Sequence, residues 1–152
     1  MSLLRGGPER RMAIFRLGVV LTAGIAISGC GDGVSPSLSG FRYDGPSPDS
    51  ATVLLLSTEF HDDDGDLSGG FLESFVDGRP TGAGLQELLP IFLLSEVAQD
   101  ATDGRLQFVL ELSASADEPP AGASFRLGIR VTDAAGHASA TSEIRLRVQE
   151  PR

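Results

Sequence analysis

The chain has no tryptophan, no lysine and a single cysteine, and these absences exclude several classes of protein. With one cysteine, no disulfide can form within the chain, so the fold has to be stabilised by packing. Without lysine, the glycine-rich stretches are not phosphate-binding loops of the P-loop type. The sequence also lacks the G-x-S-x-G and H-E-x-x-H motifs, which excludes the hydrolase classes that those motifs identify.

The remaining composition predicts one folded, turn-rich domain with an acidic surface. The chain has 152 residues, of which 41% are hydrophobic, with 19 glycines and 9 prolines. This composition is globular and not that of a disordered chain. From Cys30 onward, 8 arginines stand against 20 acidic residues, a net charge of −12. That charge argues against nucleic acid as a partner and favours cations or basic partners.

The N-terminal residues have the layout of an export signal. Four arginines lie within residues 1–16, and an uncharged run of apolar and small residues follows at 17–28. This run is shorter than the roughly 20 residues that a membrane-spanning helix needs. Residues 1–29 are therefore interpreted as a signal peptide, with an N-terminal signal helix and a start at either Met1 or Met12.

The end of this segment, Ile27-Ser28-Gly29-Cys30, resembles a lipobox, in which an aliphatic residue and two small residues precede a cysteine. The resemblance implies a bacterial lipoprotein that is cleaved before Cys30 and lipidated on its sulfur, so that the membrane becomes a partner through the lipid. Gly31, in place of aspartate, favours the outer membrane among cell-envelope locations. Residues 30–39 would be a short linker that holds a domain at 40–150 close to the membrane.

After residue 40, apolar residues mostly recur at every second position, which predicts β-strands. The Asp and Gly residues of 132–140 predict an antiparallel hairpin between the last two strands. The segment 84–100, divided by Pro90, is compatible with a strand at 91–94 or a short helix, and the helix is preferred. The expected strands are 39–43, 51–60, 70–76, 105–113, 124–131 and 143–149.

About seven short strands in roughly 110 residues predict an all-β fold, an antiparallel sandwich of two sheets. The acidic turn FHDDDGDL at 60–67 and the strand-turn-strand ending at 125–148 resemble bacterial immunoglobulin-like modules of the PKD, cadherin-like and fibronectin-III type. The resemblance implies an immunoglobulin-like β-sandwich over 40–150. The chain lacks the Cys, Trp, Cys framework of antibody domains.

The acidic turn is the main candidate for a binding site. In a sandwich of this class, the turn after the second strand and the turn between the last two strands project from the same end. Oxygen-rich, flexible loops suit Ca²⁺, although the spacing is not that of an EF-hand. An alternative is a solvated acidic turn whose Asp side chains accept backbone hydrogen bonds, with a left-handed Gly65. The candidate Ca²⁺ ligands are Asp62, Asp64, Asp66 and Asp133.

Two further sets of residues have competing interpretations. His61 and His137 are expected at the same end, where with an Asp they could ligate a transition metal, but exposed loop histidines are the preferred interpretation. Four arginines of the last two strands are expected to share one solvent face. This face is either a basic patch or, preferably, an ordinary polar face neutralised by Glu111 and Glu143. The arginines are Arg126, Arg130, Arg145 and Arg147.

The favoured function is a non-catalytic envelope lipoprotein that acts as a binding, adhesion or spacer module, with no catalytic residues and no cofactor. An envelope protein or a glycan is the expected partner. The alternative function is a calcium-dependent module of the cadherin-like or PKD-like kind. A hydrolase is least favoured, because four unshielded carboxylates on one loop supply no reason for their pKa values to diverge.

Overall fold

The computed structural model describes residues 34–46, 53–112, 119–120 and 122–148. The chain divides into two compact units, Met1–Cys30 and Gly31–Arg152, and all described residues belong to the second unit. The expected signal helix, the lipobox and Cys30 lie outside the described residues. Within the described ranges, no helix has the length and apolar character needed to cross a membrane.

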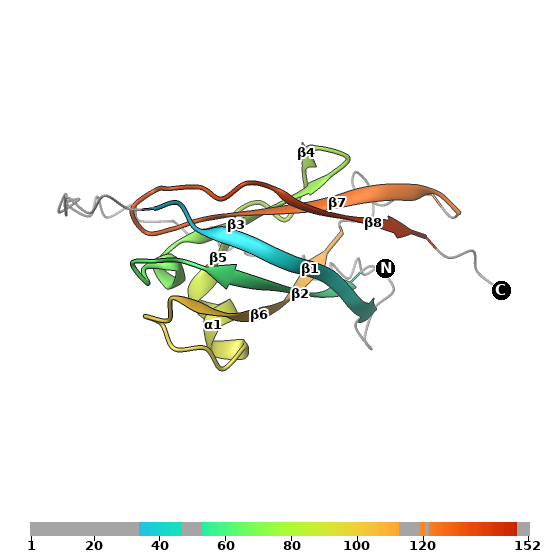
Figure 1. The fold of residues 1–152 in the computed structure, drawn as a ribbon. Helices are drawn as coiled ribbons and strands as arrows, with labels where there is room; N and C mark the ends of the chain where they lie inside the picture. The colour runs from blue at the N-terminus through green and yellow to red at the C-terminus, as the bar shows by residue number, and fades with distance from the viewer. Residues whose placement is uncertain (1–33, 47–52, 113–118, 121, 149–152) are drawn as a thin grey trace, which may run out of the picture. The chain divides into compact units, whose positions relative to one another are not determined.

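The described residues form two antiparallel sheets that face each other, as predicted (Figure 1). The strands are β1 (Ser37–Pro46), β2 (Val53–His61), β3 (Phe71–Val76), β4 (Arg79–Pro80), β5 (Gln86–Glu87), β6 (Asp103–Glu111), β7 (Ser124–Thr132) and β8 (Ser142–Arg147). One sheet has the order β1-β2-β6, and the other has the order β4-β3-β7-β8, with β5 also paired to β3. The described residues thus form an all-β sandwich of two antiparallel sheets with one short helix.

The core lies between the sheets and follows the predicted alternation. In β6, Leu106, Phe108 and Leu110 are buried while their neighbours are exposed. In β7, the predicted face is also buried, although Gly128 between its members is buried as well. That face consists of Phe125, Leu127, Ile129 and Val131. The hairpin of β7 and β8 is also confirmed. In β2, the expected face of Leu54, Leu56, Thr58 and Phe60 is buried.

The first strand differs from its prediction. It is the expected edge strand, but it begins at Ser37, inside the segment assigned to the linker, and it continues past the expected end at Tyr43 to Pro46. The register shifts between Tyr43 and Gly45, and Gly45 adopts a φ of +114°. The Asp-Gly pair therefore forms a bulge within the strand, because glycine tolerates this backbone conformation without ending the pairing.

The ambiguous segment contains a short helix, α1 (Leu88–Leu94), so the helix interpretation is confirmed and the strand at 91–94 is wrong. Pro90 lies in the first turn, where a missing N–H costs no helical hydrogen bond, so it does not divide the segment. Phe92 packs on Phe60, with ring centroids 5.1 Å apart. The Gln107 backbone N–H donates to Ser95 Oγ at 2.7 Å, which attaches the end of α1 to β6.

The connection from β2 to β3 passes very close to the end of β7. It contains a single 3-10 turn, η1 (Leu67–Gly69), whose Leu67 is completely buried. At Gly70, a Cβ atom would lie 1.8 Å from the carbonyl oxygen of Thr132. Only glycine allows this approach. The Gly70 carbonyl also accepts a hydrogen bond of 3.0 Å from the N–H of Leu88, so one residue joins the loop, β7 and α1.

This contact predicts that Gly70→Ala destabilises the domain by about 3 kcal/mol, the upper part of the range for overpacked sites. Gly69→Ala is the matched control, since its Cβ would meet one methyl group at 3.0 Å and no backbone atom. Urea unfolding of residues 31–152 measures both free energies of unfolding. Equal losses in the two variants would contradict the argument.

Candidate metal centre

The acidic loop leaves β2 through a tight, hydrogen-bonded turn. The N–H of Asp62 donates to the carbonyl of Thr102 at 2.7 Å, and the N–H of Gly65 donates to the carbonyl of Asp62 at 3.3 Å. Gly65 has a φ of +69°, as the acidic-turn alternative requires, and its Cβ position would lie 2.6 Å from the carbonyl oxygen of Asp100. The loop is therefore held against the segment that precedes β6.

The second half of the site comes from the turn between β7 and β8. Asp133 directly follows β7 and is 3% exposed. Its Oδ1 accepts the backbone N–H of His137 at 2.7 Å, and its Oδ2 accepts from His137 Nδ1 at 3.0 Å. These bonds close the turn and fix the Asp133 carboxylate in position.

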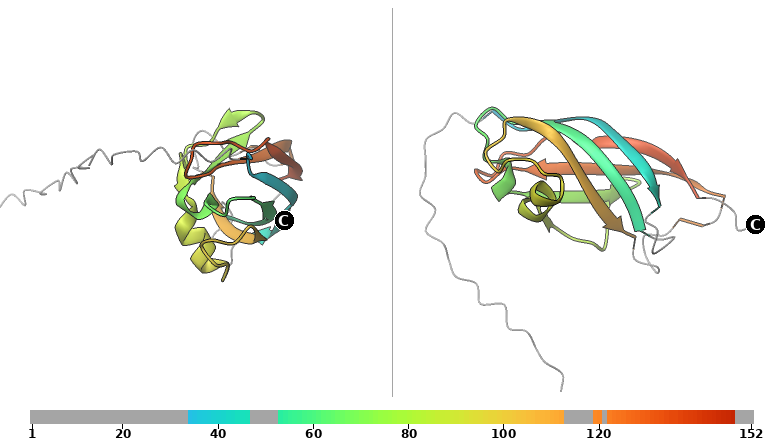
Figure 2. Two further views of the ribbon diagram at one scale, coloured as in Figure 1. Left: turned by 60° about the vertical axis from the view of Figure 1, so that its left-hand side comes forward. Right: turned by 90° about the horizontal axis from the view of Figure 1, so that it is seen from below.

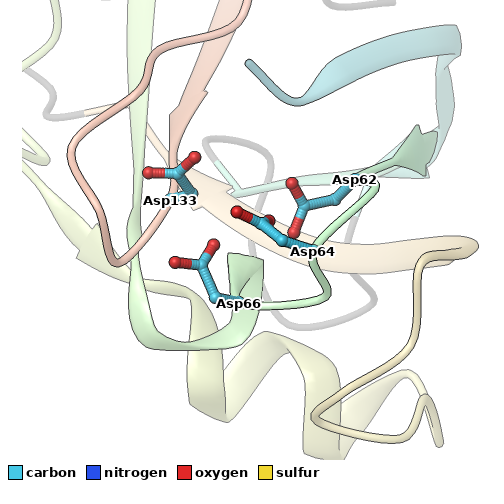
Figure 3. Close-up of side chains that lie close together, drawn as sticks. All are labelled: Asp62, Asp64, Asp66 and Asp133. Atoms are coloured by element: carbon cyan, nitrogen blue, oxygen red, sulfur yellow. The ribbon is translucent and has the colours of Figure 1, made fainter. Parts of the chain in front are cut away.

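The two turns bring four carboxylates together, and the predicted approach of Asp133 to the acidic loop is confirmed (Figure 3). One oxygen from each residue lies within 4.8 Å of the others. The other member of the loop run, Asp63, is outside this group and pairs with His61. The acidic cluster is Asp62, Asp64, Asp66 and Asp133.

Burial sets the electrostatics of this cluster. Asp62 is 1% exposed, and burial raises its pKa, an effect that the N–H of Leu67 opposes and that the charges of Asp64 and Asp66 reinforce. Burial also raises the pKa of Asp66, followed by the charges of Asp133 and Asp64, against a backbone hydrogen bond from Ala135. The charged forms of both groups are thus unfavourable in the absence of a counter-ion.

Two oxygens of the cluster are buried and accept no hydrogen bond from the described residues. They are Oδ1 of Asp62 and Oδ1 of Asp66. The other oxygen of Asp62 accepts the N–H of Leu67 at 2.9 Å, so this side chain both caps the backbone and presents a free oxygen. Buried carboxylate oxygens normally have partners, and a bound cation would supply one to both.

The donor set fits Ca²⁺ better than a transition metal. Calcium takes six to eight oxygen ligands with flexible geometry, whereas transition metals favour nitrogen or sulfur. Within the described residues, the structure does not bring the two histidines into a metal-binding group. His61 donates instead to Asp103 Oδ1 at 2.5 Å and to Asp63 Oδ1 at 2.9 Å.

Asp103 is a partner of His61 that no pattern in the sequence predicted. It is 42 positions away from His61. The antiparallel register of β2 and β6 places the two residues directly opposite each other. Because no motif links them, only the strand pairing could have identified the contact.

The four arginines of β7 and β8 share one outward face of the sheet, as expected. A guanidinium nitrogen of Arg126, Nη1, lies 3.8 Å from Oε2 of Glu143, as expected. Glu111 was expected to contribute but belongs to the other sheet, so that part is wrong. Arg130 instead donates to Glu73 on β3 at 2.5 Å and lies over the ring of Phe75.

No protein-family model matches this chain, and no curated protein matches it in sequence.

The contacts of His61 predict that its pKa is raised and that each carboxylate contributes to this shift by a different amount. The hydrogen bond and charge of Asp103 raise the pKa of His61 above its ordinary 6.5, and Asp63 adds less. The stabilisation from this pair is therefore fully present below pH 6.5 and is lost as the pH rises through the folded-state pKa. An NMR titration should show that Asp103→Asn lowers the His61 pKa more than Asp63→Asn does. The reverse order would contradict the assignment.

Proposed function

We propose that this protein is a non-catalytic, lipid-anchored module of the bacterial cell envelope whose acidic end binds a calcium ion. The observation that supports calcium binding is the pair of buried oxygens, Oδ1 of Asp62 and Oδ1 of Asp66, which have no hydrogen-bond partner among the described residues and belong to a group of four carboxylates. The lipobox-like residues ending at Cys30 support the anchor.

Calcium would reduce the electrostatic repulsion among the carboxylates of the acidic cluster. Four carboxylates within 4.8 Å repel one another, and a divalent cation offsets this repulsion directly. The four side chains would supply oxygens from both turns, so the ion would hold the acidic loop to the turn between β7 and β8. Extracellular calcium modules bind with a Kd of roughly 10⁻⁴ to 10⁻³ M, which suits a structural role of this kind.

A hydrolase remains the less favoured alternative. General acid and base catalysis needs two groups whose environments push their pKa values apart. In the acidic cluster, the pKa values of Asp62 and Asp66 are both shifted upward, and burial is the largest cause for each. Binding of an envelope protein or glycan through this end is therefore the better proposal for its role.

A calcium titration of residues 31–152 tests the metal. At a calcium concentration 100 times Kd, binding stabilises the fold by about 2.7 kcal/mol, which raises Tm by roughly 10 °C in a domain of this size. Asp66→Asn should abolish most of this rise and yet stabilise the calcium-free domain, because it removes a buried, repelled charge. Asp63→Asn is the matched control, since it removes a charge of the same loop outside the acidic cluster.

The pH dependence provides an independent check on the same site. Calcium binds the deprotonated carboxylates, so the rise in Tm should shrink as the pH falls through the elevated pKa values of Asp62 and Asp66. In the absence of calcium the sign is opposite, because the folded state then holds the protons more tightly and gains stability on acidification. A Tm that Ca²⁺ leaves unchanged at neutral pH, up to a concentration of about 0.1 M, would refute the calcium proposal.

The anchor predicts a separate result for Cys30→Ser in the full chain. Without the thiol no thioether can form, so the precursor should remain unprocessed and unlipidated, and metabolic labelling with a fatty acid should be lost. Val34→Ser, a nearby change outside the lipobox, should leave labelling intact. Equal labelling of wild type and Cys30→Ser would show that the anchor assignment is wrong.

A further inference from the structure

We infer that α1 rests on the lipid surface through an exposed row of leucines, an inference that depends on the proposed anchor at Cys30. The helix reads LLPIFLL and has no polar residue. Leu88, Ile91 and Phe92 already fill the core on its inner side. Four exposed leucines lie on the outer side of α1 or just before the helix begins, and they are called the leucine row. They are Leu85, Leu89, Leu93 and Leu94, which are 66%, 39%, 61% and 66% exposed.

This row is unusual for the surface of a soluble domain. A surface helix ordinarily turns charged residues toward solvent, and a contiguous apolar face marks a site of contact. The buried side of α1 explains why the helix packs on β6 and η1, but it does not require leucine on the exposed side. The leucine row therefore needs an apolar surface outside the domain.

The position of α1 in the fold identifies that surface. Figure 2 shows α1 at the end of the sandwich where β1 begins. The pairing agrees, because Ser37 and Asp103 both lie opposite His61, while Phe92 packs on the neighbouring Phe60. The chain thus enters the domain at the end that carries the leucine row.

The number of residues between Cys30 and β1 then limits how far this end of the domain can lie from the membrane. Ser37 is seven positions after Cys30, and seven extended residues span at most about 25 Å. A lipid on Cys30 would hold this end of the domain within reach of the bilayer, where a short apolar helix can insert its side chains at the interface.

Charge indicates which lipids would be contacted. The helix is flanked by the exposed acidic residues Glu87 and Glu96, and residues 85–100 contain no arginine. Basic residues are what attract a helix to anionic headgroups, so the leucine row should favour a zwitterionic surface.

A tryptophan probe tests this contact, because the chain has no tryptophan of its own. Residues 30–152 are coupled through the thiol of Cys30, the only cysteine, to a maleimide lipid in phosphatidylcholine vesicles. Leu93→Trp, with Leu94→Trp as a second probe, should be quenched at least twofold by brominated phosphatidylcholine. Val109→Trp is the matched control at an exposed position of β6, and its fluorescence should not change.

The coupling makes the result independent of natural lipidation. Equal quenching at Leu93 and Val109, or none at either probe in the leucine row, would overturn the inference while leaving the proposed anchor untouched. A blue shift that depends on the surface density of protein, without quenching, would show that a second copy covers the leucine row, and it would also overturn the inference.

Discussion

The close backbone contact between Gly70 and Thr132 is the constraint on which the acidic end of this domain depends. The connection between the two sheets must cross the end of the sandwich, and it does so with a buried Leu67 and no side chain at Gly70. Asp66 precedes this contact and Asp133 follows it directly on the other strand. The contact lies where the pairing of β3 with β7 begins, so it brings the carboxylates on either side of it to the same end of the sandwich.

The carboxylates of the acidic cluster both accept backbone hydrogen bonds and offer oxygens that a cation could bind. Asp62 and Asp133 each accept a backbone N–H, so they shape their turns as polar caps do. Within the part of the chain that the structure describes, Asp62 also has a buried oxygen without a hydrogen-bond partner, and Asp66 has another. The acidic-turn and calcium interpretations are thus compatible, because capping uses one oxygen of Asp62 and leaves the other for a ligand.

Two different kinds of surface lie at one end of the described domain. The acidic cluster offers charge for a cation, while the leucine row offers apolar area for lipid. The lipid anchor would enter at this same end, so calcium binding and membrane contact would both act on the part of the domain nearest to the bilayer. The opposite ends of the strands would point away from it.

Sequence alone predicted the sandwich, the buried faces of β2, β6 and β7, and the hairpin after Thr132, because alternation and turn residues are local signals. It also placed Asp133 near the acidic loop, through the resemblance to immunoglobulin-like modules. It ended the first strand at Tyr43, whereas β1 continues through Asp44-Gly45 to Pro46, and it expected Glu111 to neutralise the arginines of β7 and β8, although Glu111 lies in the other sheet. These errors concern pairing partners, which local patterns do not encode.

Local patterns in the sequence were enough to predict which residues are buried, where the chain turns and which carboxylates could reach a cation. They did not reveal that Asp103 pairs with His61, that Glu73 neutralises Arg130 or that Asp62 has an oxygen without a partner among the described residues. Each of these contacts depends on the register between strands far apart in the chain and on the burial that the packed sheets create, and neither is encoded locally.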